Sequence, residues 1–361
     1  MAKILIAPDS FKGSATSAQV AKALADGWKI SRPQDEITIA PFADGGEGTL
    51  DCIESVTSGT VRIPITVQGA TGIEHQSSWL LVGSDTAVIE MATICGITTV
   101  DQLDPLSTHS YGLGQAIKAA LEDERIHEIL IAVGGSASTD AGMGALSALG
   151  FKALDADGKE LAPGGGDLHR LAHVETPANH RNLPRGIKIL VDVQSPLTGL
   201  NGAAHIFGPQ KGADTEQVYL LNEGLLQFLK VLYVEDRAGF GAAGGVSCGL
   251  AVLLGATIVS GVETIAELVG LQEKIESSDC VITGEGSFDD QSYRGKAVGY
   301  LLEKAQESNR PVMIACGVNK NEESSLILSL IELAPSVQSA ITDSQRWLIE
   351  CGKGLASRFN H

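Results

Sequence analysis

The run Lys3-Ile-Leu-Ile-Ala7 decides the fold class, because it is apolar on both faces, as a central parallel strand is when helices cover both sides of its sheet. Shortly after it, Thr16-Ser-Ala-Gln19 has the spacing of a helix capping box. Val20, Leu24 and Trp28 then follow at helical intervals. The chain is therefore predicted to open with a parallel strand followed by an amphipathic helix.

The last third of the chain repeats this alternation of strand-length and helix-length segments. Parallel strands joined by right-handed crossovers need not come from contiguous sequence. We therefore predict that both chain ends, residues 1–63 and 263–361, build one doubly wound α/β domain around a parallel sheet. Its predicted strands are residues 3–7, 37–42, 279–283, 311–316 and 337–341, and its later helices are residues 265–276 and 296–307.

The middle of the chain has a different character. Residues 60–67, 75–82 and 86–91 are strand-like runs joined by glycine-containing turns, which predicts an antiparallel meander. We predict an inserted mixed α/β domain at residues 64–262. Beyond the meander, the pattern predicts strands at residues 128–133 and 188–193 and helices at residues 111–122, 140–149 and 215–231.

Length and charge limit the class of protein. The 361 residues are enough for about two domains, and 43% hydrophobic with 19% charged residues is ordinary for a globular protein. The 26 Lys and Arg against 44 Asp and Glu give a net charge of −18, which repels nucleic-acid phosphates and anionic lipid. We therefore expect neither nucleic acid nor a membrane surface as a partner.

The first residues and the cysteines predict a soluble, cytoplasmic protein. Lys3–Ala7 is followed by Pro8 and does not have the form of a signal peptide. The longest nearly uncharged apolar stretch, Gly249–Val262, is shorter than the roughly 20 residues of a spanning helix. The six cysteines are dispersed without a Cys-x-x-Cys pair, which predicts neither a disulfide framework nor a zinc site. Cys95, Cys248, Cys280 and Cys316 lie in apolar surroundings and are expected to be buried thiols.

Glycine is over-represented, with 42 residues, and it occurs in short polar clusters at the ends of apolar runs. Open α/β sheets bind ligands at the carboxyl ends of their strands. Each cluster alone fits a tight turn equally well, but together they predict a ligand cleft. Most follow predicted strands and two lie in loops: Ala7–Gly13, Ala43–Thr49, Val133–Asp140, Asp192–Leu197, Thr283–Asp289, Phe207–Gly212 and Gly241–Val246.

The loop Gly134–Asp140 follows a predicted strand and opens a predicted helix, so its amides and the helix dipole would attract an anion. In the alternative interpretation, Thr139 or Asp140 merely caps the helix. A cap needs one such residue, whereas this loop supplies several hydroxyls and two glycines, so we favour a phosphate site. The residues concerned are Gly134, Gly135, Ser136, Ser138, Thr139 and Asp140.

The standard nucleotide motifs are incomplete in this sequence. Gly295-Lys296 has the form of a P-loop tail, but it lies too far from Gly286, and Ala297 stands where a Ser or Thr would bind magnesium. Gly112-Leu-Gly114 lacks the third glycine of a dinucleotide-binding fingerprint. Neither a Walker NTPase nor a Rossmann dehydrogenase is therefore indicated.

Cationic and acidic residues both lie in or beside the glycine clusters. Cations there would hold a carboxylate or a phosphate. Phosphoryl transfer needs both kinds of charge, since cations neutralise the transferred group and carboxylates hold Mg²⁺ or position a hydroxyl. The cations are Lys12, Lys211, Arg294 and Lys296, and the acids are Asp9, Asp44, Glu47, Asp192, Glu285 and Asp289.

Four motifs closely resemble the bacterial glycerate kinase family, type 1, and they keep the family's order over nearly the whole chain. They are Ala7-Pro-Asp-Ser-Phe-Lys-Gly13, Pro41-Phe-Ala-Asp-Gly-Gly-Glu-Gly-Thr49, Phe207-Gly-Pro-Gln-Lys-Gly212 and Ile282-Thr-Gly-Glu-Gly286. The resemblance implies ATP- and Mg²⁺-dependent phosphorylation of D-glycerate, typically to 2-phosphoglycerate. It also implies two α/β domains, one of them flavodoxin-like, with the active site between them.

The chain departs from the family pattern at a few positions. Thr139 stands where Asn is usual, and Ala141 replaces a glycine. Ser195 stands where Asn commonly precedes the Pro196-Leu197 pair, and Ser287 stands where Arg is frequent. Each replacement keeps a small or polar group, so we still expect activity.

Our hypothesis is a kinase whose cleft closes over glycerate and ATP, with positioning supplying most of the rate. Lys12 would hold the carboxylate or the migrating phosphoryl group. Asp192 would accept the hydroxyl proton or bind Mg²⁺, and Glu285 and Asp289 are rivals for that role. The predicted substrate-binding residues are Asp9, Ser10, Asp44, Gly45, Gly46, Glu47 and Lys211, and the predicted ATP-binding residues are the loop residues named above together with Glu285.

The sequence leaves several questions open. The metal ligands are not identified: His169 and His173 would share a helix face, but exposed loop histidines are the favoured interpretation because no third ligand is evident. The oligomeric state and the choice between the 2- and 3-phosphate also stay open. The alternative functions are a non-catalytic receptor for a small carboxylate, a dehydrogenase, or a kinase acting on a related hydroxy acid.

Overall fold

The computed structural model describes residues 1–361 apart from 179–180, 294–296, 322–323, 325 and 360–361. Its contacts divide the chain into two compact units. The first comprises Met1–Asp44, Asp51–Ser58 and Val262–His361, and the second comprises Gly45–Leu50 and Gly59–Gly261. Segments 45–50 and 59–63, predicted in the first domain, thus belong to the second unit, since one bonds to Glu90 of that unit and the other opens its sheet.

The first unit is built on a five-stranded sheet, order β13-β12-β11-β1-β2, in which neighbouring strands are all parallel. The predicted opening strand lies inside this sheet, with Leu5 and Ile6 fully buried. Numbered within the unit, the order is the 2-1-3-4-5 of flavodoxin-like folds, which confirms the predicted doubly wound sheet. The strands are β1 (Lys3–Ile6), β2 (Glu36–Ile39), β11 (Cys280–Phe288), β12 (Val312–Asn319) and β13 (Ile327–Ser329).

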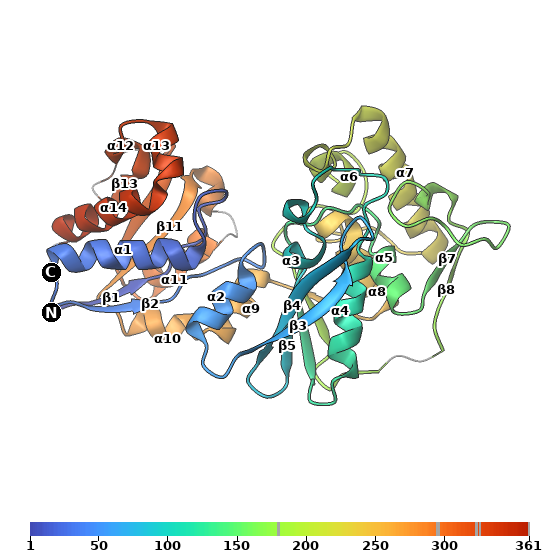
Figure 1. Ribbon diagram of the computed structural model, residues 1–361, viewed down its shortest axis with the longest axis horizontal. Coiled ribbons are helices and arrows are strands. Elements are labelled where there is room, and N and C mark those ends of the chain that lie inside the picture. Colours follow the sequence, from blue (N-terminus) through green and yellow to red (C-terminus); the bar gives the residue numbers. More distant parts are fainter. Residues whose placement is uncertain (179–180, 294–296, 322–323, 325, 360–361) are drawn as a thin grey trace. The chain divides into compact units, whose positions relative to one another are not determined.

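Helices cover both faces of this sheet. Alternate strand residues such as Ile4 and Ile282 pack against α1 and α14 on one face, whereas Ile314 and Cys316 pack against α11 on the other. Figure 1 shows α1 lying alongside α14. The helices of this unit, two of which begin in residues of the other unit, are α1 (Ser17–Ser31), α2 (Thr49–Val56), α9 (Gly261–Leu268), α10 (Leu271–Glu276), α11 (Ala297–Glu307), α12 (Leu330–Leu333), α13 (Val337–Thr342) and α14 (Ser344–Arg358).

The second unit contains a six-stranded mixed sheet, order β10-β9-β6-β5-β4-β3. The pairs from β10 to β5 are parallel, and the pairs from β5 to β3 are antiparallel, which confirms the predicted meander. The strands are β3 (Val61–Gln68), β4 (Glu74–Val82), β5 (Thr86–Glu90), β6 (Glu128–Ala132), β9 (Ile187–Leu190) and β10 (Thr257–Val259), and a separate hairpin is formed by β7 (Lys152–Leu154) and β8 (His173–Glu175).

The helices of the second unit pack on this sheet around a largely aliphatic core that includes the central residues Ile89, Ile131 and Ile189. His169 lies in a short 3-10 turn and His173 lies on β8, and both are exposed, so they do not share a helix face as metal ligands. The helices are α3 (Ala92–Cys95), α4 (Tyr111–Glu122), α5 (Met143–Ala148), α6 (Ala203–Phe207), α7 (Thr215–Leu232) and α8 (Val246–Leu253).

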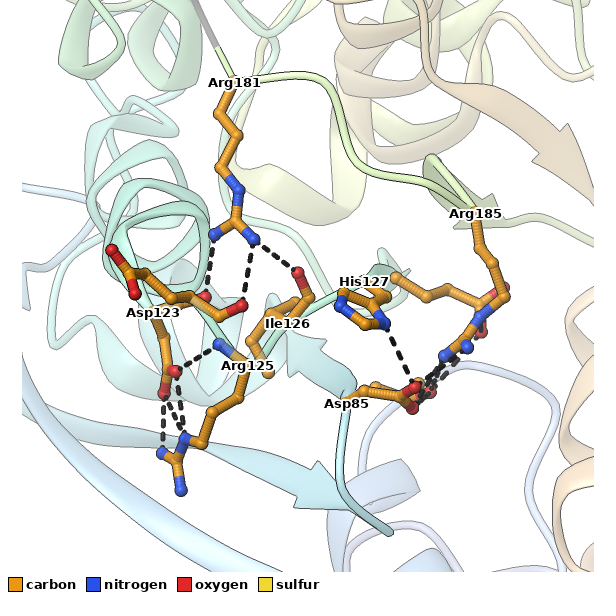
Figure 2. Close-up of polar contacts among 10 residues, drawn as sticks. Asp85, Asp123, Arg125, Ile126, His127, Arg181 and Arg185 are labelled. Atoms are coloured by element: carbon orange, nitrogen blue, oxygen red, sulfur yellow. Dashed lines mark hydrogen bonds and ion pairs between the residues drawn. The ribbon is translucent and has the colours of Figure 1, made fainter.

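A polar network ties the loops together at the amino ends of β5 and β6 (Figure 2). Arg185 donates to the two carboxylate oxygens of Asp85 at 3.0 and 2.8 Å and to Glu128 at 3.3 Å. Arg181 donates to four backbone oxygens between residues 121 and 126, where α4 ends. The Arg185 guanidinium also lowers the pKa of the Asp85 carboxyl. This network stabilises the edge opposite to the carboxyl ends of the parallel strands.

One predicted element is of the wrong type, and another is divided in two. The predicted strand 337–341 is the helix α13, because Ser336 accepts a hydrogen bond from the Ser339 amide and thereby caps it. The predicted helix 265–276 is two helices, α9 and α10, since Gly270 adopts a left-handed conformation with φ of 60° between them.

Other differences concern boundaries and elements that sequence reasoning missed. The predicted helix 140–149 begins only at Met143, and the predicted strand 279–283 continues to Phe288. The short strands β7, β8, β10 and β13 and the helices α2, α3, α6, α8 and α14 were not predicted. Three-residue strands carry too little periodicity to be recognised in a sequence.

The six cysteines are all free thiols buried in the two units, which confirms the predicted burial of Cys95, Cys248, Cys280 and Cys316 and adds Cys52 and Cys351. None of the helices in the described part of the chain is long and apolar enough to cross a membrane.

Candidate active site

A cavity of about 500 Å³ opens at the carboxyl ends of β1 and β11 in the first unit. β1 leads through α1 to β2 on one side, and β11 is followed by β12 and β13 on the other, so the strand order reverses between β1 and β11. Open α/β sheets bind ligands at such a point, because the loops diverge there and leave a crevice. The structure brings five predicted site residues together around this cavity: Asp9, Ser10, Lys12, Asp44 and Glu285.

The carboxylates of the cavity come from three separate segments. Asp9 follows β1, and its backbone amide donates to the Gly284 carbonyl at 2.8 Å. Asp44 follows β2 in the chain. Glu285 lies on β11 itself and not after its end, because the strand continues to Phe288. Three segments that are distant in sequence thus supply acidic groups to one cavity.

Asp9 has an unusual environment for a carboxyl group. Burial raises the pKa of Asp9 to about 7, and the neighbouring Asp44 adds to the rise, whereas the Ser10 amide and Lys12 oppose it. The Ser10 amide donates to Asp9 Oδ1 at 2.6 Å. A carboxyl that titrates near neutral pH inside a cavity is typical of a functional site, because a purely structural acid gains nothing from facing other carboxylates.

Glycines let the strands of the cavity approach closely. A Cβ atom on Gly317 would lie 2.4 Å from the Gly286 carbonyl oxygen, and one on Gly284 would lie 2.0 Å from the Ala315 oxygen. No real side chain fits at such distances, so β11 and β12 would have to separate. By contrast, a Cβ atom on Gly286 would lie at an ordinary 3.7 Å from the loop at Lys12. Glycine is therefore required at Gly284 and Gly317 by the packing of the two strands.

The described cations of the cavity are Lys12 and Lys320. Lys12 is exposed and lines the cavity wall, and its contact with an anion stays a prediction. Lys320 Nζ lies 3.5 Å from Asp289 Oδ2. The other two predicted cations of this region, Arg294 and Lys296, lie outside the described residues, as does the incomplete P-loop tail.

The predicted substrate loop at residues 45–50 belongs to the second unit, where Glu90 holds it. The Gly48 amide donates to Glu90 Oε1 and the Leu50 amide donates to Oε2, both at 2.9 Å. Glu90 is 1% exposed and ends β5. Sequence reasoning missed Glu90, although an acidic residue directly after the apolar run 87–89 was the available signal.

This loop contacts the predicted phosphate loop. The Gly134 amide donates to the Gly45 carbonyl oxygen at 3.3 Å. A Cβ atom on Gly134 would lie 2.5 Å from the Gly46 Cα, so only glycine allows this approach. Glu47 is exposed beside it. Two glycine clusters that are distant in sequence are thus adjacent in the second unit.

Asp140 organises the phosphate loop from the inside. It is fully buried, and Oδ2 accepts from the Ser110 amide at 2.8 Å and from the Ser110 hydroxyl at 2.7 Å. The Gly142 and Gly144 amides also donate to its carboxylate, each at 3.1 Å. Asp140 therefore caps the first turn of α5, which is the alternative interpretation of this loop. Its predicted contact with a phosphate is corrected by these bonds, because the carboxylate faces the protein.

Lys211 is also buried, at 2% exposed, and it does not face solvent as a substrate-binding lysine would. Its ammonium donates to Ser136 Oγ at 2.9 Å and to the Ser138 carbonyl oxygen. Burial lowers the pKa of Lys211 to about 8, although Asp140 favours the charged form. Lys211 thus braces the phosphate loop from behind, which corrects its predicted contact with the substrate.

Two hydroxyls of the same loop lie inside the protein. Ser138 Oγ and Thr139 Oγ1 have no hydrogen-bond partner among the described residues, and both side chains are at most 1% exposed. Gly135, in a left-handed conformation with φ of 72°, shapes the turn before them. The part of the loop that lies nearest solvent is thus Gly134 and Gly135, and Ser136 directly after them is buried.

Asp192 follows β9 and joins it to the end of β10. Its Oδ1 accepts from the Ser260 hydroxyl at 2.9 Å and from the Gly261 amide at 3.0 Å. These two bonds fix the orientation of the carboxylate, which suits either a cap of the strand ends or a positioned base.

Among the described residues, no group of three or more His, Cys, Asp and Glu side chains is arranged to hold a metal ion. Mg²⁺ commonly takes only one or two protein carboxylates and completes its shell with substrate phosphates and water. The oxygen donors of the first unit's cavity therefore suit a Mg²⁺ ion that arrives with a nucleotide.

The parallel sheet, its reversal point and the charged cavity indicate an α/β protein that binds a small anionic ligand. Comparison with known proteins gives the particular family. The sequence profile described as the glycerate kinase family matches residues 4–360. The chain therefore belongs to the glycerate kinase family, and it is an enzyme of that class.

Named relatives and a solved structure agree with this membership. The glycerate 2-kinase of Escherichia coli (strain K12) is 39% identical over 325 residues, which cover 87% of this chain and 85% of that protein. A glycerate kinase of Bacillus subtilis (strain 168) is 34% identical, and the alignment covers 98% of this chain and 97% of that protein. A crystal structure from Salmonella typhimurium LT2, assigned to glycerate kinase 2, has a TM-score of 0.82 at 33% identity and covers 99% of this chain and 97% of its own.

Proposed function

We propose that this enzyme transfers the γ-phosphoryl group of ATP to D-glycerate and releases 2-phosphoglycerate. The observation that carries the proposal is the cavity at the reversal point, where Lys12 meets the carboxylates of Asp9, Asp44 and Glu285. Phosphoryl transfer needs this combination of charges. The name of the E. coli relative, a glycerate 2-kinase, supports the 2-position.

In this proposal, Lys12 binds the carboxylate of glycerate or the migrating phosphoryl group as a point charge. Asp9 and Ser10 accept and donate hydrogen bonds at the hydroxyl groups of glycerate. Because no covalent intermediate is needed, the rate comes from holding the attacking oxygen in line with the transferred phosphorus.

Mg²⁺ would be held by Asp44 and Glu285, whose oxygens are the hard donors that this ion prefers. When bound, the ion neutralises charge on the phosphate oxygens. The proton of the attacking hydroxyl goes to a carboxylate, and Asp192 stays our predicted acceptor. Asp192 lies in the second unit and is oriented by Ser260 and Gly261.

The loop Gly134–Ser136 stays the predicted contact of the second unit with the ATP phosphates. Its amides would donate to phosphate oxygens, as amides in glycine-rich turns do. Ser138, Thr139, Asp140 and Lys211 support it from within and would not touch the nucleotide.

The test is a coupled assay with ATP, Mg²⁺ and D-glycerate, in which enolase is present and phosphoglycerate mutase is absent. Immediate formation of phosphoenolpyruvate is expected, because enolase accepts only the 2-phosphate. Phosphoenolpyruvate that appears only after mutase is added would show that the 3-phosphate is made. A panel of related hydroxy acids such as tartronate separates glycerate from the remaining alternative substrates.

A further inference from the structure

The lining of the first unit's cavity is of two chemically different kinds. The charged groups come mainly from the loop after β1 and from β11, and we call them the charged half of the lining. The apolar side chains, which we call the apolar half, are Phe11, Leu330, Ile331, Val337, Ala340 and Ile341. Glycerate, a three-carbon acid with hydroxyl groups on two of its carbons, has no apolar surface that would use this second half.

The volume of the cavity also exceeds the need of glycerate. Cavities of roughly 300–1,000 Å³ enclose ligands of the size of a nucleotide. This cavity measures about 500 Å³, whereas a three-carbon acid displaces the volume of only a few water molecules, about 100 Å³. A larger ligand, with an apolar part and an anionic part, fits both halves at once.

The helix α13 supplies the clearest sign of a ligand. Val337, Ala340 and Ile341 are spaced i, i+3 and i+4, so they share one face of the helix, and all three line the cavity. Val337 is 58% exposed and Ile341 is 50% exposed. Two branched aliphatic side chains one turn apart, left open to solvent at the wall of a cavity, gain free energy when a flat apolar ring covers them.

A polar atom in the same cavity points to the same kind of ligand. Ser287 lines the cavity, and its hydroxyl is shielded from solvent without a hydrogen-bond partner among the described residues. A ribose hydroxyl or a ring nitrogen would satisfy it. Lys12 and Lys320 at the charged half provide for phosphate groups.

We propose that the apolar half of this cavity, with α13 as its wall, binds the base and ribose of a nucleotide. The inference rests on the proposed function, because the nucleotide is the phosphoryl donor of that reaction. It assigns the nucleoside to the first unit, so that the base is held by the C-terminal segment 330–341 and not by the glycine-rich loops of the second unit.

The test is calorimetric titration of ADP and of pyrophosphate into the wild type, into Ile341→Asn and into Ile30→Asn. Ile30 is the matched control, because it is a 62% exposed isoleucine of α1 in the same unit that does not line the cavity. Ile341→Asn is expected to weaken ADP binding by about tenfold, the effect of losing one buried aliphatic contact. Pyrophosphate binding should stay within twofold, since it has no base, and Ile30→Asn should bind both as the wild type does.

Equal ADP affinity in Ile341→Asn and the wild type would overturn the inference. An equal loss of ADP and pyrophosphate affinity would also overturn it, because the effect would then lie at the phosphates or in the fold. Absence of ADP binding to the wild type would do the same. The proposed function is judged separately, by whether the wild type consumes ATP in response to D-glycerate.

Discussion

Lys12 is the cationic side chain that we propose to bind the substrate. Its side chain is exposed on the cavity wall, beside carboxylates that would otherwise repel an anion. Lys12→Ala should lower kcat/KM for glycerate at least tenfold, because a charge-assisted hydrogen bond to the substrate is lost. Lys22→Ala is the matched control, since Lys22 pairs with Asp26 on the exposed face of α1. An unchanged kcat/KM in Lys12→Ala would contradict the assigned role.

Asp9 allows a prediction in which stability and activity change in opposite directions. Its folded-state pKa of about 7 lies above the roughly 3.9 of an unfolded Asp, so the folded protein holds the proton more tightly. The free energy of unfolding is therefore reduced as pH rises from about 4 to 7, and the full cost, at most about 4 kcal/mol, is present above pH 7.

Asp9→Asn removes this cost and still accepts the Ser10 amide. In EDTA at pH 8, its Tm should exceed that of the wild type, and the difference should shrink toward zero at pH 4, while activity falls at least tenfold. Thermal melts at several pH values check this, with the exposed Asp26→Asn as control. A difference in Tm that does not depend on pH would show that the carboxyl of Asp9 titrates normally.

Two substitutions of Asp192 distinguish its role as a catalytic base from a role as a cap of the strand ends. Asp192→Asn keeps an acceptor for Ser260 and Gly261, whereas Asp192→Ala removes it and should cost about 1–3 kcal/mol of stability. If the carboxylate takes the hydroxyl proton, Asp192→Asn should lower kcat at least a hundredfold with little change in Tm. A kcat within threefold of the wild type would leave Asp192 as a cap of the strand ends.

At the scale of elements, the approach of β11 to β12 shapes the floor of the cavity. Gly317→Ala would place a Cβ atom 2.4 Å from a carbonyl oxygen of the neighbouring strand, so the strands must separate. We expect a loss of about 1–3 kcal/mol of stability, as for other overpacked sites, and a weaker affinity for nucleotide. Gly286→Ala is the matched control with ordinary contacts, and a similar loss of stability in that variant would show that glycine flexibility matters and not the approach of the strands.

The elements with strong local signals could be predicted from the sequence. Both hydrogen bonds of the predicted capping box form, one from the Gln19 amide to the Thr16 side chain and one from the Thr16 amide to the Gln19 side chain. The helix α4 has the predicted bounds, residues 111–122. The segment 337–341 was predicted wrongly as a strand, because a short apolar run is ambiguous between strand and helix. Ala340 enters the core, whereas Val337 and Ile341 stay half exposed and line the cavity, where a ligand and not a neighbouring strand would cover them.

The candidate site could be predicted in part for a related reason. Asp9, Ser10, Asp44 and their neighbours gather at one cavity because parallel strands present their carboxyl ends on the same edge of a sheet. The burial of Asp140 and Lys211 could not be predicted, since it depends on Ser110 and Ser136, partners that are distant in sequence. Long-range partners decide whether a polar residue faces a ligand or supports a loop.

At the scale of the whole chain, the first unit exists only because both chain ends meet. The helix α1 near the start of the chain packs on α14 near its end, although the two helices are far apart in sequence and the second unit is inserted between them. The contact depends on glycine: a Cβ atom on Gly27 would lie 2.1 Å from the Ile349 oxygen, and one on Gly352 would lie 2.3 Å from the Leu24 oxygen. The first unit, and with it the cavity walled by α13, therefore depends on the contact between α1 and α14, which neither chain end can form alone.

Gly352→Ala sets two effects against each other. Alanine gains about 1 kcal/mol of helix propensity over glycine, whereas the clash with the α1 backbone costs more, since neither helix can yield without opening the core. A net loss of about 1–2 kcal/mol is expected, or roughly 3–6 °C in the transition of the first unit. The fluorescence of Trp28 and Trp347, which lie on α1 and α14, reports this transition. Gly354→Ala is the control on the same helix: its Cβ atom would meet only the end of the Leu328 side chain, so this variant should be tolerated better. A Tm of Gly352→Ala above that of the wild type would show that α1 and α14 do not make this close contact.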